Sequence, residues 1–235
     1  MVKNRTIPDP VILIGHGRSG TSIMAQLMRE HLHVAFGTES QFIARYHKRL
    51  ARYGDLENDG NLRRLVEHIL EERWFRHSRK FNDFQTNAEA ILADVRQRTY
   101  RGVLDAVFGQ LTKHLNMPRW GDKTPEYNYH LDTLWELFPD AKYVHVVRDG
   151  RDVALSLKDV YFGPCNIYLA AKDWQMQINL IDPFVKRLPP EQIMEVRYED
   201  LLREPVQTFL ELATYLGVED SSGDLESTLE QEMVS

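Results

Sequence analysis

The stretch VILIGHGRSGTSIMAQL, from Val11 to Leu27, decides the fold that we predict for this chain. Its four apolar residues 11–14 are typical of a buried strand, and an apolar helix pattern begins at Ile23. The glycine-rich loop GHGRSGTS (15–22) separates the two. Glycines let the backbone come close to an anion, and the free N–H groups at a helix start attract it. We therefore predict an anion site at this loop.

The loop departs from the NTPase P-loop at one position. Where that motif has a lysine, this chain has Thr21, and the positive charge lies further forward, at Arg18. A second interpretation stays open, in which Ser19 or Thr21 caps the helix and the glycines only form a tight turn. The loop by itself does not separate these interpretations.

Composition places the chain among ordinary globular proteins. It has 235 residues, 43% of them hydrophobic and 27% charged, which suits one α/β domain with a full core. The net charge of −6 argues against a nucleic-acid binder. A single cysteine, Cys165, excludes an internal disulfide. Residues 1–10 have no apolar leader and no apolar run approaches the roughly 20 residues of a membrane span, so we expect a cytoplasmic protein.

Strand patterns alternate with helix patterns along the rest of the chain. The predicted further strands are 34–36, 119–121, 141–147 and 192–196. The predicted helices are 22–30, one that starts at Thr38, 62–75, 88–115 (one long or two joined helices), 127–138, 166–185 and one after Pro205, with a loop at 77–87. This alternation predicts right-handed crossovers and a parallel sheet.

Charged and aromatic side chains follow four of the predicted strands. They are Arg18, Lys123, Arg148 and Tyr198. Ligands of parallel α/β sheets bind beyond the carboxyl ends of the strands, so we expect these side chains at one crevice. Arg148 is followed eight residues later by Ser156 in the next helix, and an arginine with a hydroxyl can grip a second phosphate.

Each of these residues also has a purely structural interpretation. Arg148 could belong to a surface ion-pair cluster over 148–152, and Lys123 could be a solvated loop residue. Tyr198 could be a core residue, and Glu39 could favour the N-terminus of its helix. Trp174 is expected to pack between helices.

The combination resembles the sulfotransferase superfamily. The stretches that carry the resemblance are GRSGTS (17–22), GTESQF (37–42), WGDKTPEY (120–127), VVRDGRDVALSL (146–157) and VRYEDLL (196–202). Their order and spacing are similar to those of protein-tyrosine sulfotransferases and their bacterial relatives. The resemblance implies a P-loop-like three-layer α/β/α fold with a central parallel sheet. It covers about 10–217, which we take as the core of one domain over 1–235. The helical segment 50–116 lies between Glu39 and Lys123 and is expected to be an acceptor-side cover, and the polar composition of 218–235 predicts a flexible tail.

The family uses 3′-phosphoadenosine-5′-phosphosulfate (PAPS), and the resemblance assigns its binding residue by residue. The residues implied are Arg18, Ser19, Gly20, Thr21, Ser22, Arg148, Ser156 and Tyr198. The loop 18–22 would hold the 5′-phosphosulfate, and Arg148 and Ser156 the 3′-phosphate. Tyr198 would lie near the 3′-phosphate and adenosine.

The resemblance also implies the catalytic residues. Glu39 matches the general base, Lys123 the lysine that steadies the leaving side, and Arg18 and Ser22 assist it. An acceptor hydroxyl would attack in line, leaving the product PAP, with no metal and no nucleic acid involved; a homodimer stays open. Gln41 stands where the tyrosine-specific branch has an arginine, so the acceptor is left open among tyrosine or phenol, carbohydrate and small molecule. The family's late cofactor-binding lysine has no counterpart in 219–235.

Two other functions remain as alternatives. A nucleoside or small-molecule kinase would share the loop and the sheet, but it needs a lysine at position 21 and a metal-binding carboxylate. An inactive binding protein could keep the fold, and the middle helices could bind a partner, although Glu39 and Lys123 are both present. The aromatic residues Trp74, Phe75, Phe81 and Phe84 could line an acceptor pocket, but we expect them to pack between helices.

Overall fold

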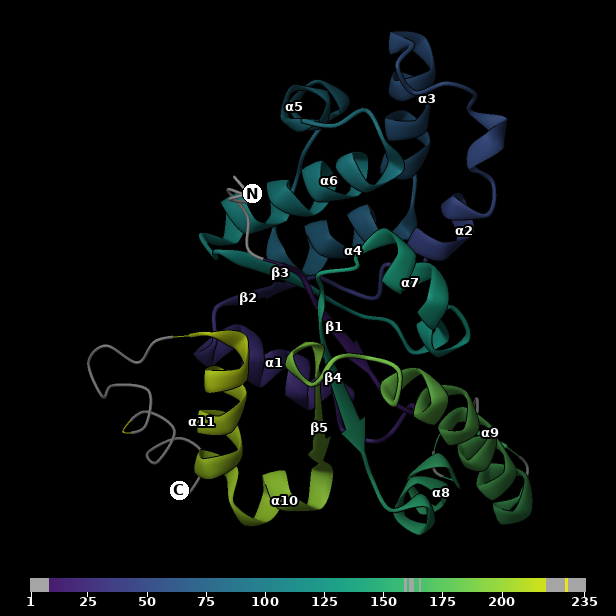
Figure 1. The fold of residues 1–235 in the computed structure, drawn as a ribbon, viewed down its shortest axis with the longest axis vertical. Coiled ribbons are helices and arrows are strands. Elements are labelled where there is room, and N and C mark those ends of the chain that lie inside the picture. The colour runs from purple at the N-terminus through teal and green to yellow at the C-terminus, as the bar shows by residue number, and fades with distance from the viewer. Residues whose placement is uncertain (1–8, 159, 161–162, 165, 219–226, 228–235) are drawn as a thin grey trace. The chain divides into compact units, whose positions relative to one another are not determined.

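Five strands form one sheet in the order β2-β3-β1-β4-β5 (Figure 1). The computed structural model describes residues 9–158, 160, 163, 164, 166–218 and 227. The strands are β1 (Val11–Ile14), β2 (Val34–Phe36), β3 (Arg119–Lys123), β4 (Lys142–Val147) and β5 (Ile193–Arg197). β2 pairs with β3 and β4 with β5 in parallel register. Each strand was predicted, and the P-loop-like α/β fold with a central parallel sheet is confirmed.

Helices connect and flank the strands. The α-helices are α1 (Thr21–His31), α2 (Ile43–His47), α3 (Asp59–Leu70), α4 (Arg73–Asn82), α5 (Ala88–Asp94), α6 (Tyr100–Leu115), α7 (Leu131–Leu137), α8 (Gly150–Lys158), α9 (Ile167–Val185), α10 (Tyr198–Arg203) and α11 (Pro205–Leu216). Three short 3₁₀ helices are η1 (Leu50–Arg52), η2 (Pro125–Tyr129) and η3 (Pro190–Gln192). Within the described residues, no helix is both long and apolar enough to cross a membrane.

Two predicted boundaries in the middle helices are wrong. The single helix predicted over 62–75 is divided between α3 and α4, and α4 occupies part of the predicted loop 77–87. The buried side chains of α4 are Trp74 and Ser78, so its apolar pattern is too sparse to indicate a helix. The segment 88–115 forms two helices, whose starts are capped by the side chains of Asn87 and Thr99.

Two helix starts also differ from the prediction. The helix predicted from Thr38 begins only at Ile43, because residues before it enter a hydrogen-bond network described below. Tyr198, predicted at a strand end, opens the short helix α10. Cys165 and the predicted tail, apart from Ser227 and Val218, lie outside the described residues.

Contacts divide the chain into two compact units, so the single domain stays a prediction. The first unit joins the segment that ends at Val11 to His33–Ala141, and the second joins Ile12–Leu32 to the part that starts at Lys142. Each unit therefore combines two distant parts of the sequence.

An aromatic cluster forms the centre of the first unit. The rings of Phe108 and Trp120 stack with centroids 4.2 Å apart, and Phe42 stacks on Phe108 at 6.1 Å. Trp74 meets Phe108 edge-on and donates a hydrogen bond from Nε1 to the Thr38 carbonyl at 2.9 Å. Trp74 is thus a packing residue, as expected. Phe84 is also buried, whereas Phe81 is exposed.

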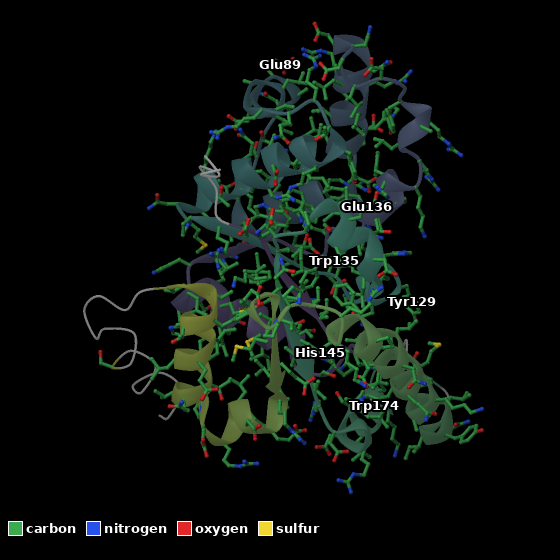
Figure 2. All side chains as sticks on the ribbon, viewed as in Figure 1. Glu89, Tyr129, Trp135, Glu136, His145 and Trp174 are labelled. Carbon is green, nitrogen blue, oxygen red and sulfur yellow. The ribbon has the colours of Figure 1, made fainter. Side chains whose placement is uncertain are left out.

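In the second unit, the helices α8 and α9 pack together. Val153, Ala154 and Leu157 of α8 form a buried cluster with Ala170, and Trp174 of α9 packs against it (Figure 2). The predicted packing role of Trp174 is confirmed. The hydroxyl of Tyr215 on α11 donates to the Tyr143 carbonyl of β4 at 2.9 Å, which fixes α11 to the strand.

Replacing Phe108 with alanine should lower the free energy of unfolding by about 3–5 kcal/mol, since it removes the ring between Trp120 and Phe42 and leaves a cavity. Urea denaturation followed by tryptophan fluorescence measures the change. The control is Phe81→Ala, whose ring is 66% exposed and whose loss should change stability by less than about 0.5 kcal/mol. Equal effects of the two variants would contradict this account of the core.

Candidate functional site

The loop between β1 and α1 has the backbone of an anion cradle. Arg18 and Gly20 both have left-handed φ angles, of 72° and 92°. Helix α1 begins at Thr21, with Gly20 as its N-cap, no side-chain cap and no acidic residue in its first turn. The alternative in which Ser19 or Thr21 caps the helix is therefore wrong. The N–H groups of the first turn are left available for an anion.

Four of the predicted anion-binding residues converge on this loop in the second unit. Arg18 Nε donates to Ser156 Oγ at 3.1 Å, and Arg148 Nη1 donates to the Arg18 carbonyl at 3.0 Å. The Arg148 guanidinium lies 4.7 Å from the centre of the Tyr198 ring. A Cβ at Gly20 would lie 2.3 Å from Tyr198 Cδ2, so this ring requires a glycine beside it. Of the four side chains predicted at one crevice, Arg18, Arg148 and Tyr198 lie together here, with Ser156 beside Arg18, and Lys123 belongs to the first unit.

Arg148 retains an unused hydrogen-bond donor. Its Nε is buried and has no partner among the described residues. The ion pair expected of a purely structural cluster forms instead between Asp149 and Arg151, at 2.6 Å. The hydrogen bond from Arg151 lowers the pKa of Asp149 to about 2. Arg148 is thus left out of that pair. A half-buried guanidinium whose Nε–H donor is free suits an anionic ligand.

The other loop residues divide by exposure. Ser22 is exposed and can present its hydroxyl, whereas Ser19 and Thr21 are buried, and the Ser19 N–H donates to the His16 carbonyl at 3.1 Å. His16, which no sequence pattern indicated, is buried. Its Nε2 binds Asp173 of α9 at 2.9 Å, and its Nδ1 binds the Gly17 carbonyl. This histidine anchors the loop to a helix that is distant in sequence, so no local pattern could have indicated it.

Glu39 and Lys123 form an ion pair in the first unit. Lys123 Nζ lies 2.5 Å from Glu39 Oε1, and the two side chains are 15% and 38% exposed, respectively. Lys123 is the last residue of β3, and Glu39 follows the neighbouring strand β2. Because these strands run parallel with Phe36 opposite Gly121, their carboxyl ends bring the two residues together. The alternatives of a solvated lysine and a helix-start glutamate are wrong.

A buried network holds the two segments that carry this pair. Thr124 Oγ1 donates to Asp122 Oδ1 at 2.8 Å and accepts from Ser40 N at 3.0 Å. The hydroxyls of Ser40 and Tyr127 are 2.6 Å apart, and Tyr127 OH also accepts from Ile43 N. These residues were not predicted from the sequence as positioning groups. The only signal was their place next to Glu39 and Lys123.

Burial raises the pKa of the Asp122 carboxyl to about 7. Hydrogen bonds from Ser40 and Thr124 and the charge of Lys123 oppose the rise, and the charge of Glu39 adds to it. Burial dominates because the carboxylate loses its hydration. In the described part of the chain, no group of three or more His, Cys, Asp or Glu residues could hold a metal ion.

Asp122 should make stability fall as pH rises from about 4 to 7. In this range the folded protein keeps the proton and the unfolded chain, with a pKa near 3.9, does not, so the unfolded state binds fewer protons. The free energy of unfolding is measured by urea denaturation at pH 5 and at pH 8. Its decrease between these two pH values should be about 2–4 kcal/mol smaller for Asp122→Asn than for the unmodified protein. The exposed Asp83→Asn is the control and should keep the unmodified slope. An unchanged slope in Asp122→Asn would contradict the raised pKa.

Comparisons with known proteins agree with this arrangement. Residues 10–222 match the sequence profile described as Sulfotransferase family. An omega-hydroxy-beta-dihydromenaquinone-9 sulfotransferase, Stf3, of Mycobacterium bovis is 28% identical over 110 residues. That match covers 42% of this chain and only 28% of the relative's length.

Solved structures of low identity share the fold. A sulfotransferase domain of the Synechococcus PCC 7002 olefin synthase aligns with a TM-score of 0.57 at 23% identity, over 94% of this chain and 78% of that one. A sulfotransferase domain from the curacin biosynthetic pathway aligns with a TM-score of 0.54 at 20% identity, over 93% and 77%. Since the profile match extends over nearly all the described residues, the chain belongs to the sulfotransferase family.

Proposed function

We propose that this protein transfers the sulfuryl group of PAPS to the hydroxyl of an acceptor. The observation that carries the proposal is the cluster on the β1–α1 loop. Arg148 binds the Arg18 carbonyl and lies over the Tyr198 ring, Arg18 binds Ser156, and the buried Arg148 Nε has no partner among the described residues. The mycobacterial relative is named for an omega-hydroxy compound, which supports a hydroxyl as the acceptor group. The class of acceptor stays open among phenol, carbohydrate and small molecule.

The loop cluster can bind the sulfuryl donor at two points. The N–H groups at the start of α1, with Arg18 and Ser22, would hold the 5′-phosphosulfate. Arg148 and Ser156 would hold the 3′-phosphate, to which a guanidinium can donate two parallel hydrogen bonds. Tyr198 would contact the adenosine beside the 3′-phosphate with the ring that now faces Arg148. PAPS carries its charges on these two groups, which matches the distribution of the cationic side chains.

The proposed reaction is an in-line displacement at sulfur. The acceptor oxygen forms a bond to sulfur while the bond from sulfur to the bridging phosphate oxygen breaks, and its electron pair stays on PAP. Glu39 takes the acceptor proton, and Lys123, which already contacts Glu39, steadies the leaving oxygen together with Arg18 and Ser22. No step uses a metal ion. The alternative function, a kinase, predicts binding of ATP with magnesium instead. This chain has Thr21 at the position where such a kinase needs a lysine.

Adenosine 3′,5′-bisphosphate should bind without metal and raise the thermal stability, by about 2.7 kcal/mol at a hundredfold excess over Kd. Arg148→Ala should weaken this binding about 10- to 100-fold, because it removes charge-assisted hydrogen bonds. Arg203→Ala removes an exposed arginine of the same unit and should leave the affinity unchanged. Stabilisation by ATP with magnesium alone would favour the kinase, and no stabilisation by either ligand would favour an inactive relative.

Glu39→Gln should lower kcat about 10²–10⁴-fold on any acceptor that the unmodified enzyme sulfates, since it removes the general base. Its affinity for adenosine 3′,5′-bisphosphate should not change. The matched control is Glu89→Gln, another carboxylate paired with a basic residue, Arg63, in the first unit. A simultaneous loss of bisphosphate affinity in Glu39→Gln would show that Glu39 is structural rather than catalytic.

A further inference from the structure

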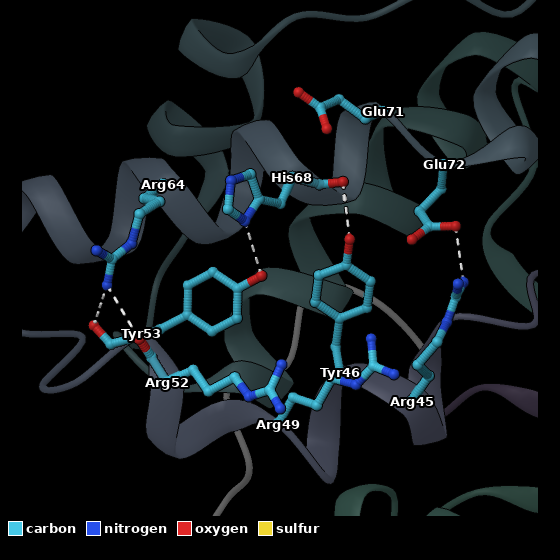
Figure 3. Close-up of a pocket in the computed structure, with 9 residues that line it drawn as sticks. All are labelled: Arg45, Tyr46, Arg49, Arg52, Tyr53, Arg64, His68, Glu71 and Glu72. Carbon is cyan, nitrogen blue, oxygen red and sulfur yellow. Dashed lines mark hydrogen bonds and ion pairs between the residues drawn. The ribbon is translucent and has the colours of Figure 1, made fainter.

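A second basic site lies in the first unit, in a pocket of about 460 Å³ between α2, η1 and α3 (Figure 3). We call it the arginine pocket, because its lining contains Arg45, Arg49, Arg52 and Arg64 against two acidic residues, Glu71 and Glu72. The segment 45–52 contributes three of these four arginines and contains no acidic residue, and Arg64 comes from α3. In a chain of net charge −6, this local positive excess requires an explanation.

The wall of the pocket is held by hydrogen bonds. The rings of Tyr46 and Tyr53 stack at 6.2 Å, and both hydroxyls bind His68, one at its carbonyl oxygen and one at Nδ1. Arg64 Nη2 donates to the carbonyls of Arg52 and Tyr53 at 3.2 and 3.0 Å. Figure 3 shows the two tyrosines side by side beneath His68. The pocket is therefore pre-organised, which reduces the entropic cost of binding.

Two of the four arginines are not used by the protein itself. Arg45 pairs with Glu72 at 2.7 Å, and Arg64 is bound to the two carbonyls. Arg49 and Arg52 are exposed and make no side-chain hydrogen bond or ion pair with any described residue. They are three residues apart on a helical turn, so they share one side of it. Two neighbouring guanidinium groups repel each other until an anion binds between them.

The pKa of the Tyr53 hydroxyl reflects the positive charges of the arginine pocket. Burial raises the pKa of its hydroxyl, and the charges of Arg64, Arg49 and Arg52 all act in the opposite direction. Three cationic groups therefore act together on this wall of the pocket. A guanidinium can donate two parallel hydrogen bonds to two oxygens of a phosphate or a carboxylate.

A second pocket, of about 370 Å³, extends this basic region. It shares Arg45 and Arg49 with the arginine pocket and adds Lys48. It is also lined by Gln41, two residues after Glu39. Glu126 is the one acidic residue among the described residues of its lining. Within the first unit, a predominantly basic lining thus leads from the arginine pocket to the segment that carries the proposed general base.

We propose that the arginine pocket binds an anionic group, a phosphate or a carboxylate, that the acceptor carries apart from its reacting hydroxyl. The assignment to the acceptor rests on the proposed function, whereas the binding of the anion does not. The pocket would anchor the acceptor by charge, and the neighbouring pocket would accommodate the part between the anion and the hydroxyl.

The binding is tested by NMR on the full ¹⁵N-labelled chain, titrated with inorganic pyrophosphate and separately with citrate. The amide of Gly54, next to Tyr53, reports on the arginine pocket, and that of Gly17 reports on the β1–α1 loop. We expect saturable shifts at Gly54, and the tighter of the two ligands identifies the phosphate or the carboxylate. Arg49→Ala/Arg52→Ala should weaken binding at Gly54 at least tenfold and leave that at Gly17 unchanged.

The matched control is Arg76→Ala/Arg79→Ala, which removes two exposed arginines at the same spacing from α4. It should keep the affinity at Gly54 within about twofold. No saturable shift at Gly54, or equal losses in both double variants, would overturn the pocket as a specific site. If adenosine 3′,5′-bisphosphate does not shift the amide resonance of Gly17, that result would instead count against the proposed function. The Gly54 and Gly17 amides thus distinguish the failure of one proposal from the failure of the other.

The role in acceptor binding is tested with pairs of hydroxyl acceptors that differ by one phosphate or carboxylate. For the anionic member, Arg49→Ala/Arg52→Ala should raise KM about tenfold with little change in kcat, and KM for the neutral member should stay constant. Equal changes in KM for both members would overturn the assignment to the acceptor.

Discussion

The close contact between Gly20 and Tyr198 is the constraint on which the proposed donor site depends. The left-handed backbone at Gly20 turns the chain into α1 without a capping side chain, which leaves the first N–H groups of the helix free. The absence of a Cβ lets the Tyr198 ring lie against the loop, and Arg148 lies over the same ring. Arg148 in turn binds the Arg18 carbonyl, so one glycine fixes the positions of three functional side chains.

In both units the proposed functional residues follow the carboxyl ends of the parallel strands. In the second unit, β1, β4 and β5 lead to Arg18, Arg148 and Tyr198. In the first, β2 and β3 lead to Glu39 and Lys123. In the proposed reaction the first unit supplies Glu39 and Lys123, and the second binds the anionic groups of PAPS. The buried network around Asp122 and the contact of His16 with Asp173 give each half its own support.

Strands β1, β2 and β4 could be predicted from sequence because each is a short, buried and largely apolar run between turn signals. Strand β3, with the sequence RWGDK, has no such run. Most predicted site residues could be located because they follow these strands. What could not be predicted depends on contacts between distant segments. Helix α4 has few buried residues, the start of α2 is delayed by the hydrogen bond of Ser40, and the partner of His16 lies on the distant helix α9. The local periodicity of apolar residues predicts helices and strands, but it does not predict contacts between distant segments.

The buried carboxyl of Asp122 has a consequence for calorimetry. At pH 6 its pKa of about 7 keeps it largely protonated in the folded state, whereas the unfolded chain is ionised there. Unfolding therefore releases a proton, which the buffer takes up. The heat of unfolding recorded in a calorimeter then contains the ionisation enthalpy of the buffer and differs between phosphate and an amine buffer at the same pH. The buffer dependence of the heat of unfolding therefore measures the proton that Asp122 releases.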